Sequence, residues 1–129
     1  MQIQLLSFGF KYGVPVGVNY IWDVRFLVNP YWIAELKPFT GLHAGVAEYV
    51  LEHHRSRDFL QLMEPMVLFL IKQNREADKE KCVLAVGCTG GRHRSVAVTE
   101  RLREYLLARS INPTVIHRDI EKDGAVDGS

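Results

Sequence analysis

Short apolar runs alternate along the chain with longer segments in which apolar residues recur at helical spacing. Four such runs cover residues 3–8, 18–24, 82–86 and 114–117, and glycine, proline or charged residues bound them. Runs of this length with these boundaries are typical of β-strands. The run at 82–86 has no polar position, which is typical of a parallel strand buried on both faces. The pattern therefore predicts a sheet of about four strands.

The segments between these runs show the period of amphipathic helices. A first helix is predicted over about residues 44–53. Asp58 and Gln61 have the spacing of a capping box, which predicts that a second helix begins there and extends to about Glu76. Pro65 within it predicts a kink or a new start. A third helix is predicted after the third strand.

Strands that alternate with helices predict an α/β fold with three layers, in which helices flank a mostly parallel sheet. The connection between the first two strands is short for a parallel crossover. The direction of the second strand therefore stays open, with an abbreviated crossover helix as one solution. The 129 residues predict one domain over residues 1–122 and a disordered, acidic tail over residues 123–129.

Composition and charge narrow the class of protein. An apolar fraction of 47% and a charged fraction of 24% are those of a soluble globular domain. The 16 Lys and Arg residues nearly balance 15 Asp and Glu residues, and a net charge of +1 predicts no general attraction to nucleic acid or membranes. The longest apolar run, residues 66–71, is too short to cross a bilayer. No signal-peptide pattern precedes the first strand.

Cysteine and histidine spacing predicts neither a disulfide nor a metal site. Cys82 and Cys88 lie at opposite ends of one predicted strand, too far apart to form a bridge. Free thiols suit a reducing compartment, so we expect the protein to be cytoplasmic. His53 and His54 are adjacent and would not share a helix face, and no partner stands at metal-ligand spacing. We therefore expect no metal and no cofactor.

A glycine-rich loop joins the third strand to the third helix at residues 87–95. Gly90 and Gly91 allow a tight turn that brings backbone N–H groups close to a bound group. The helix that follows points its free N–H groups and its positive dipole end at the same place. Arg92 and Arg94 add charge suited to phosphate. The loop therefore predicts an anion site for a phosphate group.

The same loop has the Cys-x5-Arg spacing of cysteine-dependent phosphatases. In that chemistry Cys88 is the nucleophile, Arg94 holds the phosphate oxygens, and the hydroxyl of Ser95 eases departure of the thiolate. A separate acid is also needed, and Asp23 is a candidate. The alternative is that Cys88 is a small buried residue in a loop that only binds its ligand.

Other candidate residues follow predicted strands, at the ends where parallel sheets bind ligands. Lys11 could reach a phosphate or could be solvated. Asp23 could bind a sugar hydroxyl or an ammonium group, or could pair with a nearby arginine. His93 lies between two arginines that disfavour its protonation, so it is either a neutral donor to a ligand or a residue packed at the helix start. His117 ends the last strand and has no evident partner in the sequence.

An excess of arginine in the third helical segment allows a further interpretation. Residues 92–109 contain five arginines against Glu100 and Glu104. Such a face is either solvated or a footprint for the phosphate backbone of RNA. Apart from Arg94, which the anion loop shares, the candidate RNA-binding residues are Arg92, Arg101, Arg103 and Arg109.

Several short motifs, in order from about residue 3 to 122, carry a family resemblance. They include Ser-Phe-Gly-Phe-Lys-Tyr-Gly at 7–13, Asp-Val-Arg-Phe-Leu at 23–27, Gly-Cys-Thr-Gly-Gly at 87–91 and His-Arg-Asp at 117–119. Shorter matches are Asn29-Pro30, Thr40-Gly41 and His93-Arg94-Ser95. With these motifs the chain resembles the C-terminal domain of the RapZ (YvcJ) family.

The resemblance implies a sugar-kinase-like α/β fold that binds glucosamine-6-phosphate and takes part in binding a small regulatory RNA. In that family a P-loop ATPase domain precedes this domain, but no Gly-x4-Gly-Lys-Ser/Thr occurs in the chain, so ATP hydrolysis is not implied. Tyr31 stands where the family has a histidine after Asn-Pro, and Arg92 where it often has glutamine. The implied ligand pocket comprises Asp23, Cys88, Thr89, Gly90, His93 and Arg94, and we extend it to Gly91, Ser95, Lys11 and Tyr31.

Together these features predict a sensor or regulatory domain that binds a phosphorylated small molecule such as an amino-sugar phosphate, and not an enzyme. A loop for anions without a well-placed general acid or base favours binding over catalysis. The alternatives are a cysteine-dependent phosphatase and an RNA-binding module. A small RNA, a protein partner and self-association stay open as interactions, and no membrane contact is expected.

Overall fold

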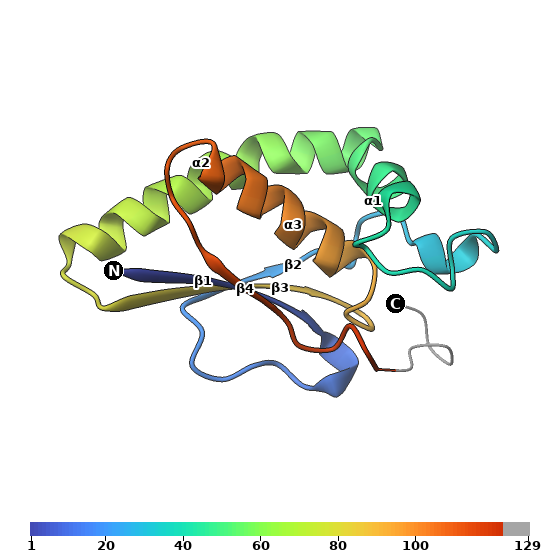
Figure 1. Ribbon diagram of the computed structural model, residues 1–129, viewed down its shortest axis with the longest axis horizontal. Coiled ribbons are helices and arrows are strands. Elements are labelled where there is room, and N and C mark those ends of the chain that lie inside the picture. Colours follow the sequence, from blue (N-terminus) through green and yellow to red (C-terminus); the bar gives the residue numbers. More distant parts are fainter. Residues whose placement is uncertain (123–129) are drawn as a thin grey trace.

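The computed structural model describes residues 1–122; the acidic tail expected at 123–129 lies outside the described residues. Its strands form one sheet in the order β2-β3-β1-β4, and every neighbouring pair is parallel. Figure 1 shows the order of the elements along the chain. They are β1 (Gln2–Gly9), the 3-10 helix η1 (Phe10–Tyr12), β2 (Tyr20–Asp23), the 3-10 helix η2 (Pro30–Trp32), α1 (Ala44–Leu51), α2 (His54–Glu76), β3 (Lys81–Cys88), α3 (Arg94–Leu107) and β4 (Thr114–His117).

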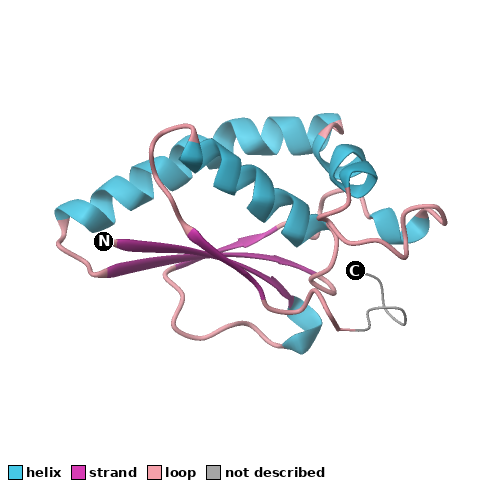
Figure 2. Cartoon of the chain, in the orientation of Figure 1, coloured by secondary structure: helices cyan, strands magenta, loops and turns pink. Residues whose placement is uncertain are grey.

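Different elements cover the two faces of the sheet. Figure 2 shows the three α-helices on one side of the sheet, while the segment from η1 to β2 passes along the other side. The predicted α/β class and four-stranded sheet with flanking helices are confirmed, and the sheet is parallel throughout. Residues 10–19 form the abbreviated crossover that the short connection allowed, since they carry the chain from β1 past β3 to a parallel β2.

The core lies between the sheet and the helices. Alternate residues of β3, Cys82, Leu84 and Val86, point into it and pack with the apolar faces of α2 and α3. Val83 and Ala85 on the other face of β3 are also buried, so the prediction of a strand covered on both sides is confirmed. This burial holds the end of β3, and with it the glycine-rich loop, in a fixed place.

Helix α2 differs from its prediction at its start. The helix begins at His54, and the Nδ1 atom of His53 accepts a hydrogen bond from the Arg55 N–H at 3.1 Å. The capping box predicted at Asp58 and Gln61 is wrong, because an imidazole already caps the helix one turn earlier. The helix also continues unbroken through Pro65, so no new helix starts there. Within residues 1–122, no helix is long and apolar enough to cross a membrane.

Candidate functional site

The carboxyl ends of the four parallel strands meet at one edge of the sheet. The register pairs Gly9 with Cys88, Asp23 with Gly87, and Ser7 with His117. The candidate groups that the sequence places after each strand therefore lie at the same edge, where α/β sheets bind ligands. The loop between β3 and α3 lies at the centre of this edge, because β3 is an inner strand.

Two glycines let the loop lie directly against the end of β1. A Cβ atom added to Gly9 would overlap the carbonyl carbon of Gly90, and one added to Gly91 would lie 2.6 Å from the Gly9 nitrogen. Gly91 also has a φ of +78°, which side chains other than glycine rarely adopt. The contact between these backbones fixes the shape of the loop.

Arg94, the first residue of α3, is the central cation of the site. It is only 4% exposed. Its Nη1 atom donates to the carbonyl oxygens of Arg25 at 2.6 Å and Leu27 at 3.2 Å, and its Nη2 atom donates to Thr89 Oγ1 at 3.3 Å. Arg94 therefore ties the segment after β2 to the loop after β3.

The charge of Arg94 is not balanced by a carboxylate. Within residues 1–122 it belongs to no ion pair, and its buried Nε atom has no hydrogen-bond partner. Burial lowers the pKa of Arg94, while Cys88 and Asp23 act in the opposite direction. A guanidinium nevertheless stays protonated in proteins. A buried cation without an anionic partner is costly, so the site suits an incoming anion.

Cys88 and Ser95 lie together beneath the loop. Both residues are fully buried, and the Cys88 thiol donates to Ser95 Oγ at 3.1 Å. The structure thus brings together the Cys, Ser and Arg that the Cys-x5-Arg spacing predicts. Because the sulfur is shielded from solvent, it is poorly placed to meet a substrate in this conformation.

His93 is fully buried at the start of α3. Its Nε2 atom bonds to the carbonyl oxygen of Phe39 at 2.5 Å and must therefore be the donor. Burial lowers the pKa of His93, and the charges of Arg92 and Arg94 lower it further, against the opposing effect of the Phe39 carbonyl. The ring is neutral at pH 7, and its Nδ1 atom is an acceptor that has no hydrogen-bond partner among residues 1–122.

Asp23 lies at the open end of the site, paired with Arg25. Its carboxylate accepts from Arg25 Nε at 3.0 Å and from Nη2 at 2.7 Å, and both side chains are about half exposed. The hydrogen bond from Arg25 is the main cause that lowers the pKa of Asp23. Sequence reasoning allowed such a pair but did not include Arg25 in the site, although its spacing of two residues from Asp23 was a usable signal.

Lys11 and Tyr31 are placed by two short 3-10 helices. The Lys11 N–H donates to the Thr89 carbonyl oxygen at 3.2 Å, so η1 lies beside the glycine loop. Tyr31 lies in η2, and the Lys37 ammonium is 4.5 Å from the centre of its ring.

Asp119 ends the stretch 117–119, which the sequence places at this edge of the sheet, but the sequence analysis gave it no role in the site. It is fully buried, and its carboxylate accepts from the Gly9 N–H at 2.8 Å, from Arg118 at 2.8 Å and from Lys122 at 2.6 Å. Burial alone would raise the pKa of Asp119, but these donors, with Arg118 the strongest, lower it overall. Asp119 thus anchors the end of β1 against the loop. Its place two residues after β4 indicated the edge of the sheet, but not the bond to Gly9.

Asp119 should make the stability of the domain sensitive to acid. Its folded-state pKa lies below the unfolded value, so its contribution is complete above about pH 4 and is lost as the pH falls towards the folded pKa. We expect Asp119→Asn to lower the free energy of unfolding by about 1–3 kcal/mol at neutral pH, and by less near pH 3. Urea denaturation at both pH values measures this, with exposed Glu35→Gln as the control. An equal effect at both pH values would contradict the role of the charge.

His117 has partners that only the fold reveals. Its Nδ1 atom accepts from the Ser7 hydroxyl at 2.6 Å, and its Nε2 atom donates to Glu100 at 2.7 Å. This chain of contacts joins β1, β4 and α3. Ser7 is fully buried, so the network holds the ends of β1 and β4 together inside the domain.

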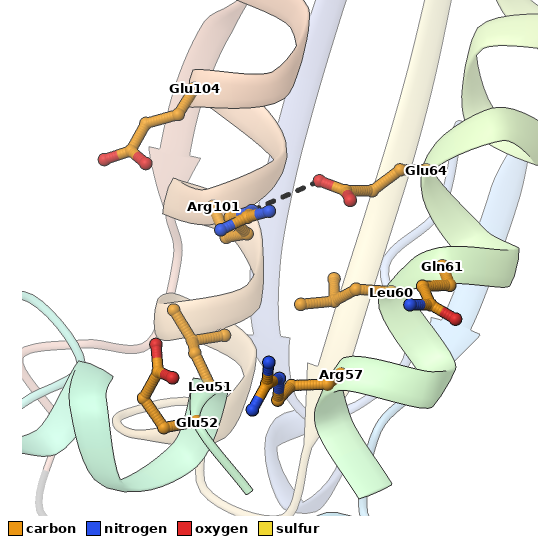
Figure 3. A pocket seen from close by; sticks show the side chains of 8 residues that line it. All are labelled: Leu51, Glu52, Arg57, Leu60, Gln61, Glu64, Arg101 and Glu104. Atoms are coloured by element: carbon orange, nitrogen blue, oxygen red, sulfur yellow. Dashed lines mark hydrogen bonds and ion pairs between the residues drawn. The ribbon is translucent and has the colours of Figure 1, made fainter. Parts of the chain in front are cut away.

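Most of the candidate RNA-binding arginines make contacts within the domain. Arg101 points towards Glu64 across a hollow between α2 and α3, with Nε 3.3 Å from the carboxylate (Figure 3). Arg103 pairs with Glu100 at 3.0 Å, and the Arg109 guanidinium lies 3.6 Å from the centre of the Tyr105 ring. Arg92 lies apart from these at the glycine loop, where it donates to the Pro38 and Lys122 carbonyl oxygens at 3.4 Å. RNA binding by these residues stays a prediction.

Residues 1–122 contain no candidate metal site, since no three His, Cys, Asp or Glu side chains lie close enough together to hold an ion. The glycine loop and the start of α3 instead carry donors: the Arg94 guanidinium, the Thr89 hydroxyl and the first N–H groups of α3. Such a set holds an anion.

Comparisons with known proteins agree with this architecture. Residues 1–121 match the RapZ C-terminal domain. A nucleotide-binding protein of Citrifermentans bemidjiense is 47% identical over 122 residues, which cover 95% of this chain and 42% of that protein. Nucleotide-binding proteins of Caldicellulosiruptor saccharolyticus and Clostridium perfringens are 45% and 44% identical over 123 residues, with the same coverage. The chain thus spans about two fifths of the length of these relatives, and it belongs to the RapZ C-terminal domain family.

Proposed function

We propose that this regulatory domain binds a phosphorylated small metabolite, such as an amino-sugar phosphate, at the loop between β3 and α3. One observation carries the proposal: Arg94 is buried at the start of α3 without a carboxylate partner among the described residues. The phosphate of a ligand would supply the missing negative charge. It would also meet the positive end of the α3 dipole.

The loop backbone supports the same proposal. The N–H groups of Gly90, Gly91 and Arg92 donate to no backbone oxygen of residues 1–122. Free N–H groups on a glycine loop at a helix start are a common way to hold phosphate oxygens. Asp23 and Arg25, at the open end, would face the sugar part of the ligand. There the Asp23 carboxylate suits an ammonium or a hydroxyl group.

A cysteine-dependent phosphatase is the second candidate, favoured by the contact of 3.1 Å between Cys88 and Ser95. Two observations favour binding over this chemistry. The thiol of Cys88 is fully buried, which shields its sulfur from a substrate in solution. The acid that the reaction requires is also missing at Asp23, because its pairing with Arg25 lowers the pKa of that carboxyl.

Thermal melting with three compounds tests the proposal. We expect glucosamine-6-phosphate to raise the melting temperature most, inorganic phosphate less, and glucosamine least. A ligand at one hundred times its Kd stabilises the folded state by about 2.7 kcal/mol. Absence of any shift at millimolar concentrations would contradict the proposal. If the protein hydrolysed an aryl phosphate and the Cys88→Ser variant did not, the phosphatase would replace the binding proposal.

A further inference from the structure

The end of α1, the first half of α2 and the second half of α3 surround a hollow (Figure 3). Its volume is about 330 Å³, which is within the usual range for sites that hold a small molecule. Leu51 and Leu60 supply its apolar surface. The other side chains that line it are charged or carry an amide: Glu52, Arg57, Gln61, Glu64, Arg101 and Glu104. The hollow thus combines apolar surface with charges of both signs.

Glu64 places a largely buried carboxylate in this hollow. The residue is 7% exposed, and Figure 3 shows its side chain reaching from α2 towards Arg101 on α3. Its one hydrogen bond among residues 1–122 comes from Arg101 Nε at 3.3 Å, although a carboxylate can accept several. A buried charge with so few donors is costly. The Glu64 carboxylate therefore has capacity for a further donor, and the hollow is the space from which one can approach.

Three other charges at the hollow lack partners. Glu52 follows α1, Arg57 lies near the start of α2, and Glu104 lies on α3. None of these three belongs to an ion pair within residues 1–122. A single ion pair at a surface contributes little, but several that converge on one molecule form a network. The hollow therefore suits a ligand that carries both positive and negative groups.

We propose that the hollow binds a free amino acid with a cationic side chain, such as lysine. Once Glu64 and Arg101 are paired, two carboxylates and one guanidinium stay without partners, and lysine carries two ammonium groups and one carboxylate. Arg57 would hold the ligand carboxylate through its forked donors. The two apolar side chains would contact the methylene chain of the ligand. The lining residues lie outside the glycine loop, so this site is independent of the phosphate site.

Isothermal titration calorimetry with L-lysine and with 1,5-diaminopentane tests the site. The diamine keeps both ammonium groups of lysine and lacks only the carboxylate. We expect saturable binding of L-lysine, and we expect the diamine to bind about fivefold or more weakly, because it offers nothing to Arg57. No saturable binding of L-lysine at millimolar concentrations would overturn the proposal. Equal affinity for both compounds would overturn it too, since any cation would then do.

Variants of the lining residues assign each group of the ligand. Arg57→Gln should weaken L-lysine by about fivefold or more and leave the diamine at least as tightly bound. The double variant Glu52→Gln/Glu104→Gln should weaken both compounds. Arg75→Gln is the matched control, since Arg75 is an exposed arginine of the same helix that does not line the hollow.

Far-UV circular dichroism checks that these variants fold. An Arg57→Gln protein that folds and binds L-lysine as the wild type does would overturn the proposal. So would undiminished binding in the folded double variant, because the carboxylates would then hold no part of the ligand.

Discussion

Replacement of Arg94 by alanine should abolish the thermal response to phosphorylated ligands. It should also lower the free energy of unfolding by about 2–4 kcal/mol. The second effect arises because the guanidinium is the donor to the carbonyl oxygens of Arg25 and Leu27. Without it, those acceptors in the segment after β2 lose their hydrogen bonds. Chemical denaturation and ligand-dependent melting measure the two effects separately.

Arg94→Lys is the matched variant for this experiment. It keeps the positive charge but loses the planar fork that reaches both carbonyl oxygens and Thr89 together. We expect Arg94→Lys to be less stable than the wild type and to retain a weak response to phosphate compounds. A stable Arg94→Ala protein with an undiminished response to glucosamine-6-phosphate would show that the anion binds elsewhere.

Replacement of Gly9 by alanine should destabilise the domain by about 3 kcal/mol or more. The added methyl group would overlap backbone atoms of Gly90 and Gly91, which cannot move away as a flexible side chain can. The end of β1 and the glycine loop would separate, and the Gly9 N–H would leave Asp119. We therefore expect a lower melting temperature together with a lost ligand response.

Gly45→Ala is the control for the Gly9 variant. A methyl group there would lie 3.1 Å from the imidazole of His43, a side chain that can shift, and alanine favours the helical conformation of α1. We expect a change within about 1 kcal/mol. If Gly9→Ala were equally harmless, close contact between β1 and the loop could not be what shapes the site.

The sequence predicts best where the signal is local. The apolar run that becomes β3, the glycines after it and the helix that starts at Arg94 are neighbours in the chain, so their order alone indicates a strand, a loop and a helix. The start of α2 was wrong for a local reason as well. Histidine at position 53 caps the helix, a role for which Asp58 was the more usual residue type.

The contacts that complete the site are not local, which is why the sequence did not predict them. Arg94 bonds to a segment 67 to 69 residues earlier, and Asp119 holds Gly9 across 110 residues. No spacing rule connects such positions. The parallel order β2-β3-β1-β4 brings them together, and that order depends on the short crossover after β1, whose direction the pattern left open.

Backbone amide spectra during a titration with glucosamine-6-phosphate test the central claim most directly. ¹H–¹⁵N correlation spectra report each N–H group separately. We predict saturable shifts concentrated at Gly90, Gly91, Arg92 and Arg94, with smaller shifts at Asp23, and no such shifts with glucosamine alone. Saturable shifts confined to the hollow in Figure 3 that Glu64 and Arg101 line, or no shifts at millimolar ligand, would contradict a phosphate site on this loop.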